Sequence, residues 1–394
     1  MKPSPWLPLL CAAACANGPS SRPSADRNQA AQQQGGLGIP VQYEKLSNGL
    51  KVVLSPDHTS PVAVVGVYYG IGFRIEPRDR TGFAHLFEHM MFQGSQNLGK
   101  LQFIKLVQSN GGILNGSTRF DFTNYFEVVP SNTVQTMLWA ESDPNNAVLV
   151  VAGDIDPAQV LSRVKQYFEA IPRQEIPARP DISEPRQDQE KRVSQDDKLA
   201  TRPALAFAYH VPPRNTPEWY AMGILREILA GGRDSLLYQE LVQKRGLTGE
   251  VDGGINELGN QFNIQGPTLL DFYLFHDKDK PADDILAAAD GQIEKLRSAP
   301  VDAATLSRAK VKIRARFYDQ LDAFSGFGKA DLLAAYALFD DAPQKINGIL
   351  DEFQKVTPEL LQKTAQEWLR KTNRTILVVN PGAPAKSASA GGAQ

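Results

Sequence analysis

The first half of the chain alternates short apolar runs with turn residues. Runs at residues 41–46 and 50–54 are separated by Asn48-Gly49, a pair typical of a tight hairpin turn. A nearly continuous apolar run follows at residues 61–70, and residues 119–129 alternate and are rich in Phe, Thr, Tyr and Val. This pattern predicts four strands.

Two helices are predicted between the third and fourth of these strands. The hydroxyl of Thr81 can cap a helix over residues 81–92, and Gly94 follows as a stop signal. A second helix is predicted over residues 100–109, which are again followed by glycines.

Two apolar runs that lie far apart in the sequence resemble each other. Residues 145–151 read Asn-Asn-Ala-Val-Leu-Val-Val, and residues 373–379 read Asn-Arg-Thr-Ile-Leu-Val-Val. If both form the last strand of a repeated unit, the chain holds two similar α+β halves. Chance similarity between two buried strands is the alternative, because such runs are common.

The two halves differ in length. In the first half, a single predicted helix at residues 131–142 precedes the closing strand. Residues 41–154 number 114, against 192 for residues 191–382, so the difference is 78 residues, or about two long helices and a connection. We therefore expect that a segment is missing between Asp143 and Pro144. The second half has a predicted strand at 204–211 and predicted helices at 216–229, 282–297, 303–321 and 358–370.

The N-terminus is typical of an export signal. Lys2 precedes an apolar run at residues 6–16 that is too short to span a bilayer. Small residues precede Cys15, as in bacterial lipoprotein cleavage sites, so Cys15 is a predicted lipidation site. An ordinary secretory signal, cut a few residues later, is the alternative. Either way we expect an exported protein, in the periplasm or anchored to the envelope as a lipoprotein.

Length and charge exclude some classes of protein. A chain of 394 residues is long enough for two domains with cores of their own. With 42 basic and 44 acidic residues, the formal charge of −2 gives no general attraction to nucleic acid or to an anionic membrane.

The predicted organisation is an export signal (1–16), a disordered tether (17–38), an N-terminal domain (39–175), a linker (176–192), a C-terminal domain (193–382) and a disordered tail (383–394).

The sequence His85-Leu86-Phe87-Glu88-His89 carries the candidate chemistry. Its two imidazoles, at i and i+4, share one helical face with Glu88 beside them. Two neutral imidazoles can bind Zn²⁺, while an adjacent carboxylate that is not a ligand can take a proton from a metal-bound water. With five histidines in the chain, the expected number of chance matches to this motif is on the order of 10⁻². Two histidines packed as ordinary helix residues are the structural alternative.

The segment around this motif and three others resemble one family. Residues 82–94, 110–118, 121–130 and 145–156 are similar to the pitrilysin/insulinase family of zinc metallopeptidases, whose signature is the inverted H-x-x-E-H motif. The resemblance covers nearly all of residues 41–382 and is weaker in the second half.

The resemblance implies a fold and a set of roles. The fold would be α+β, with two related domains, each a curved, mostly antiparallel sheet backed by helices, and the first domain truncated. His85 and His89 would bind Zn²⁺ as the cofactor, and Glu88 would act as general base. Peptides or unfolded segments would be the substrates, and Asn115 and Tyr125 would lie near their path. A turn residue and a sheet aromatic are the alternative roles for these last two.

The chain departs from the family pattern at the third metal ligand. In the family this is a Glu roughly seventy-odd residues beyond the second His. Here residues 139–143 run directly into residues 144–147, at the place where the segment that should carry this Glu is expected. Glu141 or Asp143 could replace the missing ligand, and a solvated helix end is the alternative for these two residues.

A second departure lies in the other half. Active family members often place an Arg and a Tyr seven residues apart after a Leu-Tyr-x-x-Leu helix. Here Leu237-Tyr238-Gln239-Glu240-Leu241 is present, but Arg245 has Asp252 at that spacing. In the family a paired subunit can supply such groups, which indicates a homologous partner chain. Gly231-Gly232 is interpreted as a helix C-cap.

Two functions follow from the sequence. The first is an exported zinc endopeptidase that works with a homologous subunit, as a hetero- or homodimer. The second is a catalytically inactive family member that binds peptides or stabilises an active partner. They differ in whether three protein groups converge on one metal ion. A carbohydrate or lipid carrier would need a large apolar cavity that no segment specifies.

Overall fold

A computed structural model describes residues 36–95, 98–142, 147–173, 175 and 180–382. The predicted export signal, the lipidation site at Cys15, most of the tether, the C-terminal tail and the junction between Asp143 and Pro144 lie outside the described residues. Within the described residues, no helix combines the length and apolar character needed to cross a membrane.

The first half forms a six-stranded sheet, here called sheet 1. Its strand order is β1-β2-β6-β3-β5-β4, and only β2 and β6 run parallel. The hairpin turn predicted at Asn48-Gly49 is confirmed, because β1 and β2 pair antiparallel on either side of it and Gly49 has φ +96°. The side-chain amide of Asn48 donates a hydrogen bond to the Phe168 carbonyl. The strands are β1 (Gln42–Lys45), β2 (Lys51–Pro56), β3 (Val62–Tyr69), β4 (Ile113–Thr118), β5 (Thr123–Pro130) and β6 (Ala147–Gly153).

The second half forms a five-stranded sheet, sheet 2, with the topology of strands β2 to β6 of sheet 1. Its order is β7-β11-β8-β10-β9, and only β7 and β11 run parallel. The parallel pairs even begin alike, with Lys51 opposite Val148 and Lys191 opposite Thr375. The strands are β7 (Lys191–Asp197), β8 (Ala204–His210), β9 (Asp252–Ile255), β10 (Leu269–Phe275) and β11 (Arg374–Pro381).

The predicted repeat is therefore confirmed: β6 and β11 are corresponding strands of two α+β halves. In the two sheets, Val148 of β6 corresponds to Thr375 of β11, whereas the similar sequence runs align Val148 with Ile376. The two alignments therefore differ by one residue. Leu149 and Val151 face the helices of the first half, and Ile376 and Val378 face those of the second. A shift of one residue turns every side chain of a strand to the other face, so burial decides the register.

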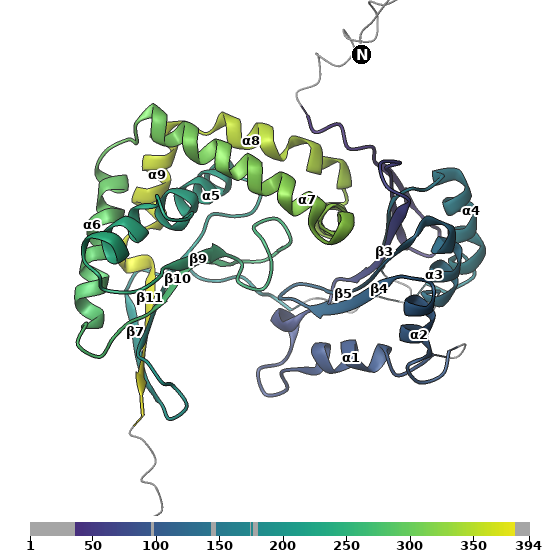
Figure 1. Cartoon of the computed structure of the whole chain (residues 1–394), viewed down its shortest axis with the longest axis horizontal. Helices are drawn as coiled ribbons and strands as arrows, with labels where there is room; N and C mark the ends of the chain where they lie inside the picture. The colour runs from purple at the N-terminus through teal and green to yellow at the C-terminus, as the bar shows by residue number, and fades with distance from the viewer. Residues whose placement is uncertain (1–35, 96–97, 143–146, 174, 176–179, 383–394) are drawn as a thin grey trace, which may run out of the picture. The chain divides into compact units, whose positions relative to one another are not determined.

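Helices follow corresponding strands along the chain in the two halves, as the labels in Figure 1 allow the reader to trace. Helices α1 (Phe83–Met91) and α2 (Gln102–Ser109) lie between β3 and β4 of the first half. In the second half, α5 (Pro217–Ala230) and the π-helix η3 (Tyr238–Lys244) lie between the corresponding strands β8 and β9. The helix after the next strand is α3 (Val134–Ala140) in the first half and α6 (Ala282–Ser298) in the second. Helix α4 (Pro157–Phe168) follows β6.

The second half has additional helices before its closing strand: α7 (Ala303–Asp340), α8 (Ile349–Lys355) and α9 (Pro358–Trp368). The stretch between β5 and β6 is 16 residues long (131–146), and the stretch between β10 and β11 is 98 (276–373), a difference of 82. Among the described residues, the first half has no counterparts of α7, α8 and α9. This agrees in size with the segment expected to be missing from the first half.

Helix α7 consists of two segments. Residues 323–326 have non-helical backbone angles, with positive φ at Phe324, Ser325 and Gly326, so the chain changes direction there. The first segment (303–322) matches the predicted helix at 303–321. The second segment (327–340) was not predicted as a separate helix, and it packs against sheet 1.

Sheet 1 is therefore covered on both faces. One face packs against α2, α3 and α4 of its own half. The other packs against the second segment of α7, where the ring of Phe327 stacks on that of Phe126 with centroids 3.7 Å apart. The Tyr68 hydroxyl donates to the buried Asp331 carboxylate over 3.1 Å. Apolar residues on both faces explain why β3 and β6 read as continuous apolar runs.

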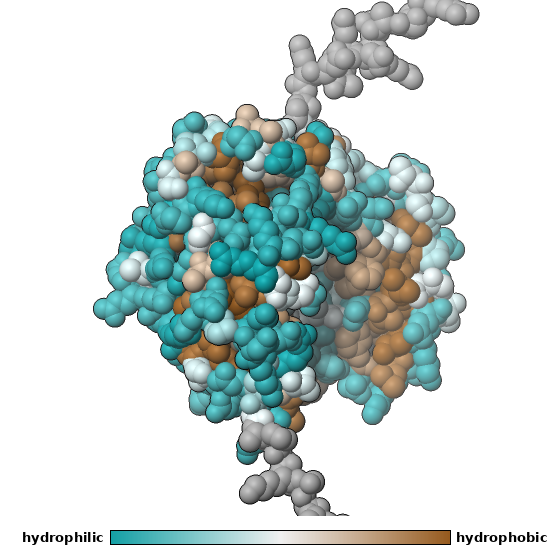
Figure 2. Space-filling model, turned by 60° about the vertical axis from the view of Figure 1, so that its left-hand side comes forward, coloured by the Kyte–Doolittle hydropathy of each residue, from teal (hydrophilic) through white to brown (hydrophobic). Residues whose placement is uncertain are grey.

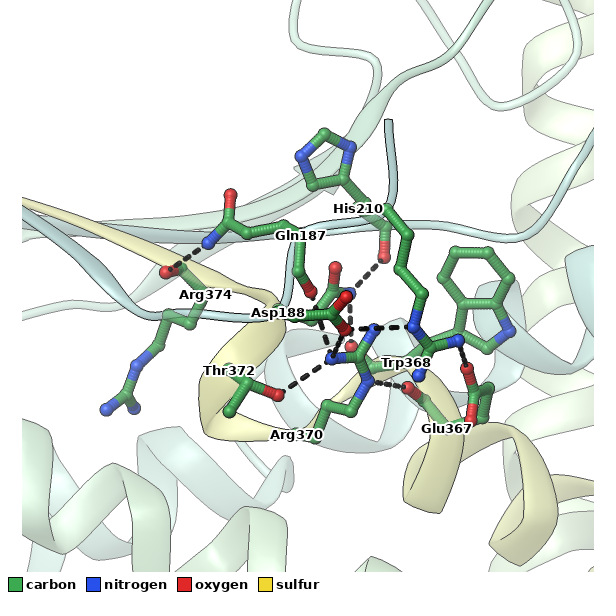
Figure 3. Close-up of polar contacts among 10 residues, drawn as sticks. Gln187, Asp188, His210, Glu367, Trp368, Arg370, Thr372 and Arg374 are labelled. Carbon is green, nitrogen blue, oxygen red and sulfur yellow. Dashed lines mark hydrogen bonds and ion pairs between the residues drawn. The ribbon is translucent and has the colours of Figure 1, made fainter. Parts of the chain in front are cut away.

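The chain reaches sheet 2 before the predicted end of the linker. Strand β7 begins at Lys191, and the Gln187 amide already donates to the Arg374 carbonyl of β11 over 2.8 Å (Figure 3). The guanidinium of Arg370 bonds to the Gln187 carbonyl and to Asp188. The boundary between the two domains stays a prediction.

Candidate metal site

The helix that carries the H-x-x-E-H motif begins later than predicted and has a different cap. Gly82, with φ +95°, is the N-cap of α1, and no hydroxyl caps the helix, so the role assigned to Thr81 is wrong. The Glu76 carboxylate instead accepts hydrogen bonds from the backbone N–H groups of Gly82 and Ala84, at 2.7 and 2.6 Å. A carboxylate binds helix N–H groups more strongly than a hydroxyl does, because it also interacts favourably with the helix dipole.

The two imidazoles of the motif converge. The Nε2 atoms of His85 and His89 lie 3.1 Å apart, and their ring centroids lie 4.8 Å apart. Two imidazoles bound to one tetrahedral Zn²⁺ at about 2.0–2.1 Å would have nitrogens separated by about 3.3–3.4 Å. Both histidines are exposed, so packed side chains do not seal them off. The pair therefore has the separation and access that a metal ion requires.

Glu88 lies on the inner side of the same helix and is 7% exposed. Its Oε2 atom accepts a hydrogen bond from the Thr118 hydroxyl of β4 over 2.7 Å. Gly116 on the same strand leaves room for the carboxylate, since a β-carbon there would lie 3.1 Å from Glu88 Oε1. Strand β4 thus fixes Glu88 beside the histidine pair.

Among the described residues, a third acidic ligand is not found at the pair. In the described part of the chain, no group of three or more His, Cys, Asp or Glu side chains is placed to hold a metal ion. Asp143 lies outside the described residues. Glu141 is only 8% exposed, so it is not the solvated helix end considered as an alternative. Glu141 neighbours the fully buried Glu127. Burial raises the pKa of Glu127 well above its usual range, and the charge of Glu141 and a hydrogen bond between the two side chains raise it further.

The two predicted substrate-contacting residues differ in exposure. Asn115 is exposed on β4, and its side-chain oxygen accepts from the Gly116 N–H. Tyr125 on β5 is 6% exposed and packs edge-on against Tyr69 and Phe92. The geometry of Tyr125 is that of the sheet aromatic given as its alternative. Their contact with substrate stays a prediction.

The second half has an ion-pair cluster at the place that corresponds to the motif. Glu227 and Glu88 each lie three residues before the last residue of their helix, α5 or α1. Glu227 is 3% exposed, and Arg316 and Lys312 of the first segment of α7 approach its carboxylate. Sequence reasoning missed this cluster, because it joins residues about ninety positions apart.

Gly231, Arg245 and Asp252 of the second half, which were singled out in the sequence, all have defined local partners. Gly231 is the C-cap of α5 as predicted, and Gly232 follows with φ +107°. Arg245 pairs with Glu240 of η3, and Asp252 accepts from the Tyr273 hydroxyl over 2.8 Å. Asp271 nearby has a pKa raised to about 6, because it is largely buried and lies near the charge of Glu257.

Repeated α+β halves with an H-x-x-E-H helix in the first define a class of metallopeptidase fold. The family description "Insulinase (Peptidase family M16)" matches residues 51–149, and "Peptidase M16 inactive domain" matches residues 143–312. The chain therefore belongs to peptidase family M16, the insulinase family, as a single chain with two related domains.

Three known proteins illustrate the similarity. "Zinc protease PqqE" of Helicobacter pylori is 24% identical over 419 aligned positions, which cover 85% of this chain and 92% of that protein. A crystal structure of a protease from Helicobacter pylori has a TM-score of 0.79 at 22% identity, over 87% of this chain and 100% of that one. The first half of the periplasmic protease PqqL from Escherichia coli has a TM-score of 0.67 at 15% identity, over 87% and 93%.

The length of the first alignment bears on the missing segment. Since 85% of 394 residues is about 335, about 84 of the 419 aligned positions have no residue of this chain. That number is close to the difference of 82 residues between the two halves.

Proposed function

We propose that this chain is the zinc-binding subunit of an M16-type endopeptidase. The observation that carries the proposal is the 3.1 Å separation of the exposed His85 and His89 Nε2 atoms, with the Glu88 carboxylate held beside them. The donor set fits a zinc ion in part. These two nitrogens would be two of the three protein ligands that a catalytic zinc needs, and the third must come from outside the described residues.

Glu88 is the proposed general base. Zinc at this position would make a bound water acidic, with a pKa of about 7, and would polarise the substrate carbonyl. Glu88 would accept the proton of the attacking water and later donate it to the leaving amine. The Thr118 hydroxyl, which bonds to one carboxylate oxygen, keeps the other oxygen oriented for this transfer.

Strand β4 is the proposed binding edge for substrate. It is the last strand in the order of sheet 1 and pairs with β5 on one side only. An extended peptide can add to such an edge through main-chain hydrogen bonds, which makes binding tolerant of sequence. Because Thr118 and Gly116 of this strand touch Glu88, a peptide on this edge would lie next to the base.

The location and the partners of the protein are proposed from its sequence, its ligand set and its similarity to known proteins. The predicted export signal and the similarity to a periplasmic protease favour an exported protein, with a lipid anchor at Cys15 as the more specific proposal. Peptides or unfolded segments are the proposed substrates, and a homologous subunit is the proposed partner. The absence of a third ligand among the described residues favours a partner that contributes to the site.

Zinc content and peptide cleavage test this function. We expect the purified protein, with its partner present, to bind one zinc ion per chain and to cleave an unstructured peptide. Glu88→Gln should abolish cleavage while zinc remains bound, because Glu88 is not a ligand. Glu169→Gln, at an exposed position at the end of α4, is the matched control and should retain activity.

A non-catalytic role is the second candidate. It is favoured by the same lack of a third ligand in the part of the chain that the structure describes, since two imidazoles alone do not complete a catalytic zinc site. In that case the protein would bind no stoichiometric zinc but would bind peptides on β4 or stabilise an active homologue. Zinc-dependent cleavage that Glu88→Gln removes would reject this second candidate.

A further inference from the structure

A buried polar cluster joins the first half of the chain to the second. Asp121 lies in the turn between β4 and β5, and its side chain is 4% exposed. Its Oδ2 atom accepts hydrogen bonds from the backbone N–H groups of Gln265 and Gly266 of the second half, over 2.8 and 3.1 Å. Its Oδ1 atom accepts a hydrogen bond from Arg74 Nε over 2.6 Å. One carboxylate therefore binds both halves at once.

Burial distinguishes this cluster from an ordinary surface ion pair. Figure 2 shows a mostly hydrophilic surface, and ion pairs on such a surface contribute little because water screens them. The Arg74 side chain is only 17% exposed, and its Nη1 atom also donates to the Pro267 carbonyl over 2.7 Å. Loss of one charge from a buried pair leaves the other charge without its partner, so such a pair resists separation. We call Arg74, Asp121 and residues 265–267 the clamp.

The loop of the second half that the clamp binds is itself held in place. The Asn263 side-chain amide donates to the buried Asp331 carboxylate of α7 over 3.0 Å, and the Tyr68 hydroxyl of β3 donates to the same carboxylate over 3.1 Å. The Asn256 side-chain amide donates to Asn263 Oδ1 over 3.0 Å. Because these side chains are buried, the loop has a defined position relative to α7 and sheet 1.

On the other side, the clamp is continuous with the segment that leads into α1. Arg74 lies in the 3-10 helix η1 (Phe73–Ile75). The backbone N–H groups of residues 73 and 74 donate to the carbonyls of residues 119 and 120, over 3.0 and 2.9 Å. A β-carbon on Gly72 would lie 2.3 Å from the carbonyl oxygen of residue 119, so no space separates η1 from the turn that carries Asp121. The two segments must therefore move together.

The neighbours of Arg74 contact the metal-site helix. The Phe73 ring lies edge-on to the His85 ring, with centroids 6.3 Å apart. Glu76, two residues after Arg74, accepts hydrogen bonds from the first N–H groups of α1. Residues 73–76 thus contact the second half, a proposed zinc ligand and the N-terminus of the helix. A displacement of the clamp would change both contacts that orient α1.

We propose that Arg74 and Asp121 are positioning residues, through which the placement of the second half sets the orientation of α1 and of the His85 ring. Neither residue touches the metal ion or the reacting atoms. The inference rests on the proposed function in one respect, since the group that the clamp orients is the proposed zinc-binding pair. Separation of the halves at the clamp should therefore weaken zinc binding.

Asp121→Asn and Gly266→Ala test the proposal from the two sides of the clamp. An Asn side chain cannot accept hydrogen bonds on both sides, because only one of its two terminal atoms is an oxygen. A methyl group on Gly266 would lie 2.9 Å from Arg74 Nε and would displace the guanidinium. Asp57→Asn is the matched control, because Asp57 also joins the halves, through an ion pair with Lys329 of α7 over 2.6 Å, but lies outside residues 73–76.

The first measurement uses the full chain without metal. We expect Asp121→Asn and Gly266→Ala each to raise the amide hydrogen exchange of α1 by about tenfold, as loss of a charge-assisted hydrogen bond predicts. The same variants should shift the ring signals of His85 in the NMR spectrum of protein with isotope-labelled histidine, because the adjacent Phe73 ring moves. Asp57→Asn should change neither. The double variant of Asp121 and Gly266 should exchange no faster than the faster single variant, since both changes break one contact.

The second measurement is the affinity of the same proteins for zinc. Loss of groups that orient metal ligands typically costs 10–100-fold in affinity, so we expect a loss of about this size in both clamp variants. Asp57→Asn should bind zinc as the unmodified chain does. The comparison separates a change at the clamp from general loosening of the two halves.

Three results would overturn the proposal. Faster exchange at 265–267 with unchanged exchange of α1 and an unchanged His85 signal would show that the clamp opens without moving the helix. An equal effect of Asp57→Asn would show that any loosening of the halves suffices. Unchanged exchange at both 265–267 and α1 would show that the clamp does not hold the halves. If the metal-free results are as expected but the unmodified chain binds no zinc, the link to α1 stands and the proposed function fails.

Discussion

The contact between sheet 1 and the second segment of α7 can be measured with a double-mutant cycle on Phe126 and Phe327. The two rings stack with centroids 3.7 Å apart and an interplanar angle of 20°. Phe126 is 8% exposed and Phe327 is half-buried, so each truncation to Ala removes a large buried area. Fully buried Phe→Ala changes cost about 3–5 kcal/mol, and we expect about 2–4 kcal/mol for each site here.

The two changes should not be additive. Each single variant already loses the ring pair, so the double variant should be less destabilised than the sum by about 0.5–1.5 kcal/mol. Urea unfolding of the four proteins, followed by far-UV circular dichroism and by tryptophan fluorescence, gives the free energies. Tyr318→Ala is the control, because Tyr318 of the first segment of α7 is 52% exposed and its truncation should cost little. Strict additivity of Phe126→Ala and Phe327→Ala would show that this helix does not pack on sheet 1 in solution.

Three further predictions concern charge and space. Burial and a neighbouring carboxylate raise the pKa of Asp271 in the folded state from 3.8 to about 6. The free energy of unfolding therefore decreases as the pH rises from about 4 to 6, because the folded state binds this proton more tightly than the unfolded state does. Asp271→Asn should therefore stabilise the protein by about 1–2 kcal/mol at pH 7.5, after allowance for screening, and give no gain in urea unfolding at pH 4. Arg374→Leu should cost about 3–5 kcal/mol by the same assay, since Arg374 is 2% exposed and its two carboxylate partners would remain; a change below 1 kcal/mol would contradict this. Gly116→Ala should lower the kcat of peptide cleavage about tenfold with little change in zinc content, because the added methyl group displaces Glu88; unchanged kcat would show that the carboxylate adjusts freely.

Local patterns in the sequence predicted most of the strands and the site helix. The continuous runs at β3 and β6 and the turn at Asn48-Gly49 depend on neighbours in sequence, so they could be read directly. The i, i+4 spacing of His85 and His89 likewise fixes their convergence once a helix forms. The similarity of β6 and β11 predicted the repeat, and the excess length of the second half predicted the missing helices.

Features that depend on distant residues were not predictable in this way. The Glu76 carboxylate caps α1 from seven residues before the helix, and a local reading assigned the cap to Thr81 instead. The bend in α7 has no proline to mark it and falls at Ser325-Gly326, a pair at which helices often kink, but the helix pattern that ended at residue 321 did not identify the second segment. Burial of Glu141 also comes from tertiary packing, since its sequence position at a helix end indicated exposure.

The crossing of α7 between the two halves has a consequence for synthesis. Strand β6 ends at Gly153, but the residues that cover the other face of sheet 1 lie at 327–340. At about 5–20 residues per second, the ribosome needs on the order of 10–40 seconds to make the intervening chain. Throughout that interval one side of the nascent sheet has no native cover, so this protein should depend on chaperones, or on delivery to the export machinery before folding, more than a chain whose domains are completed one after the other.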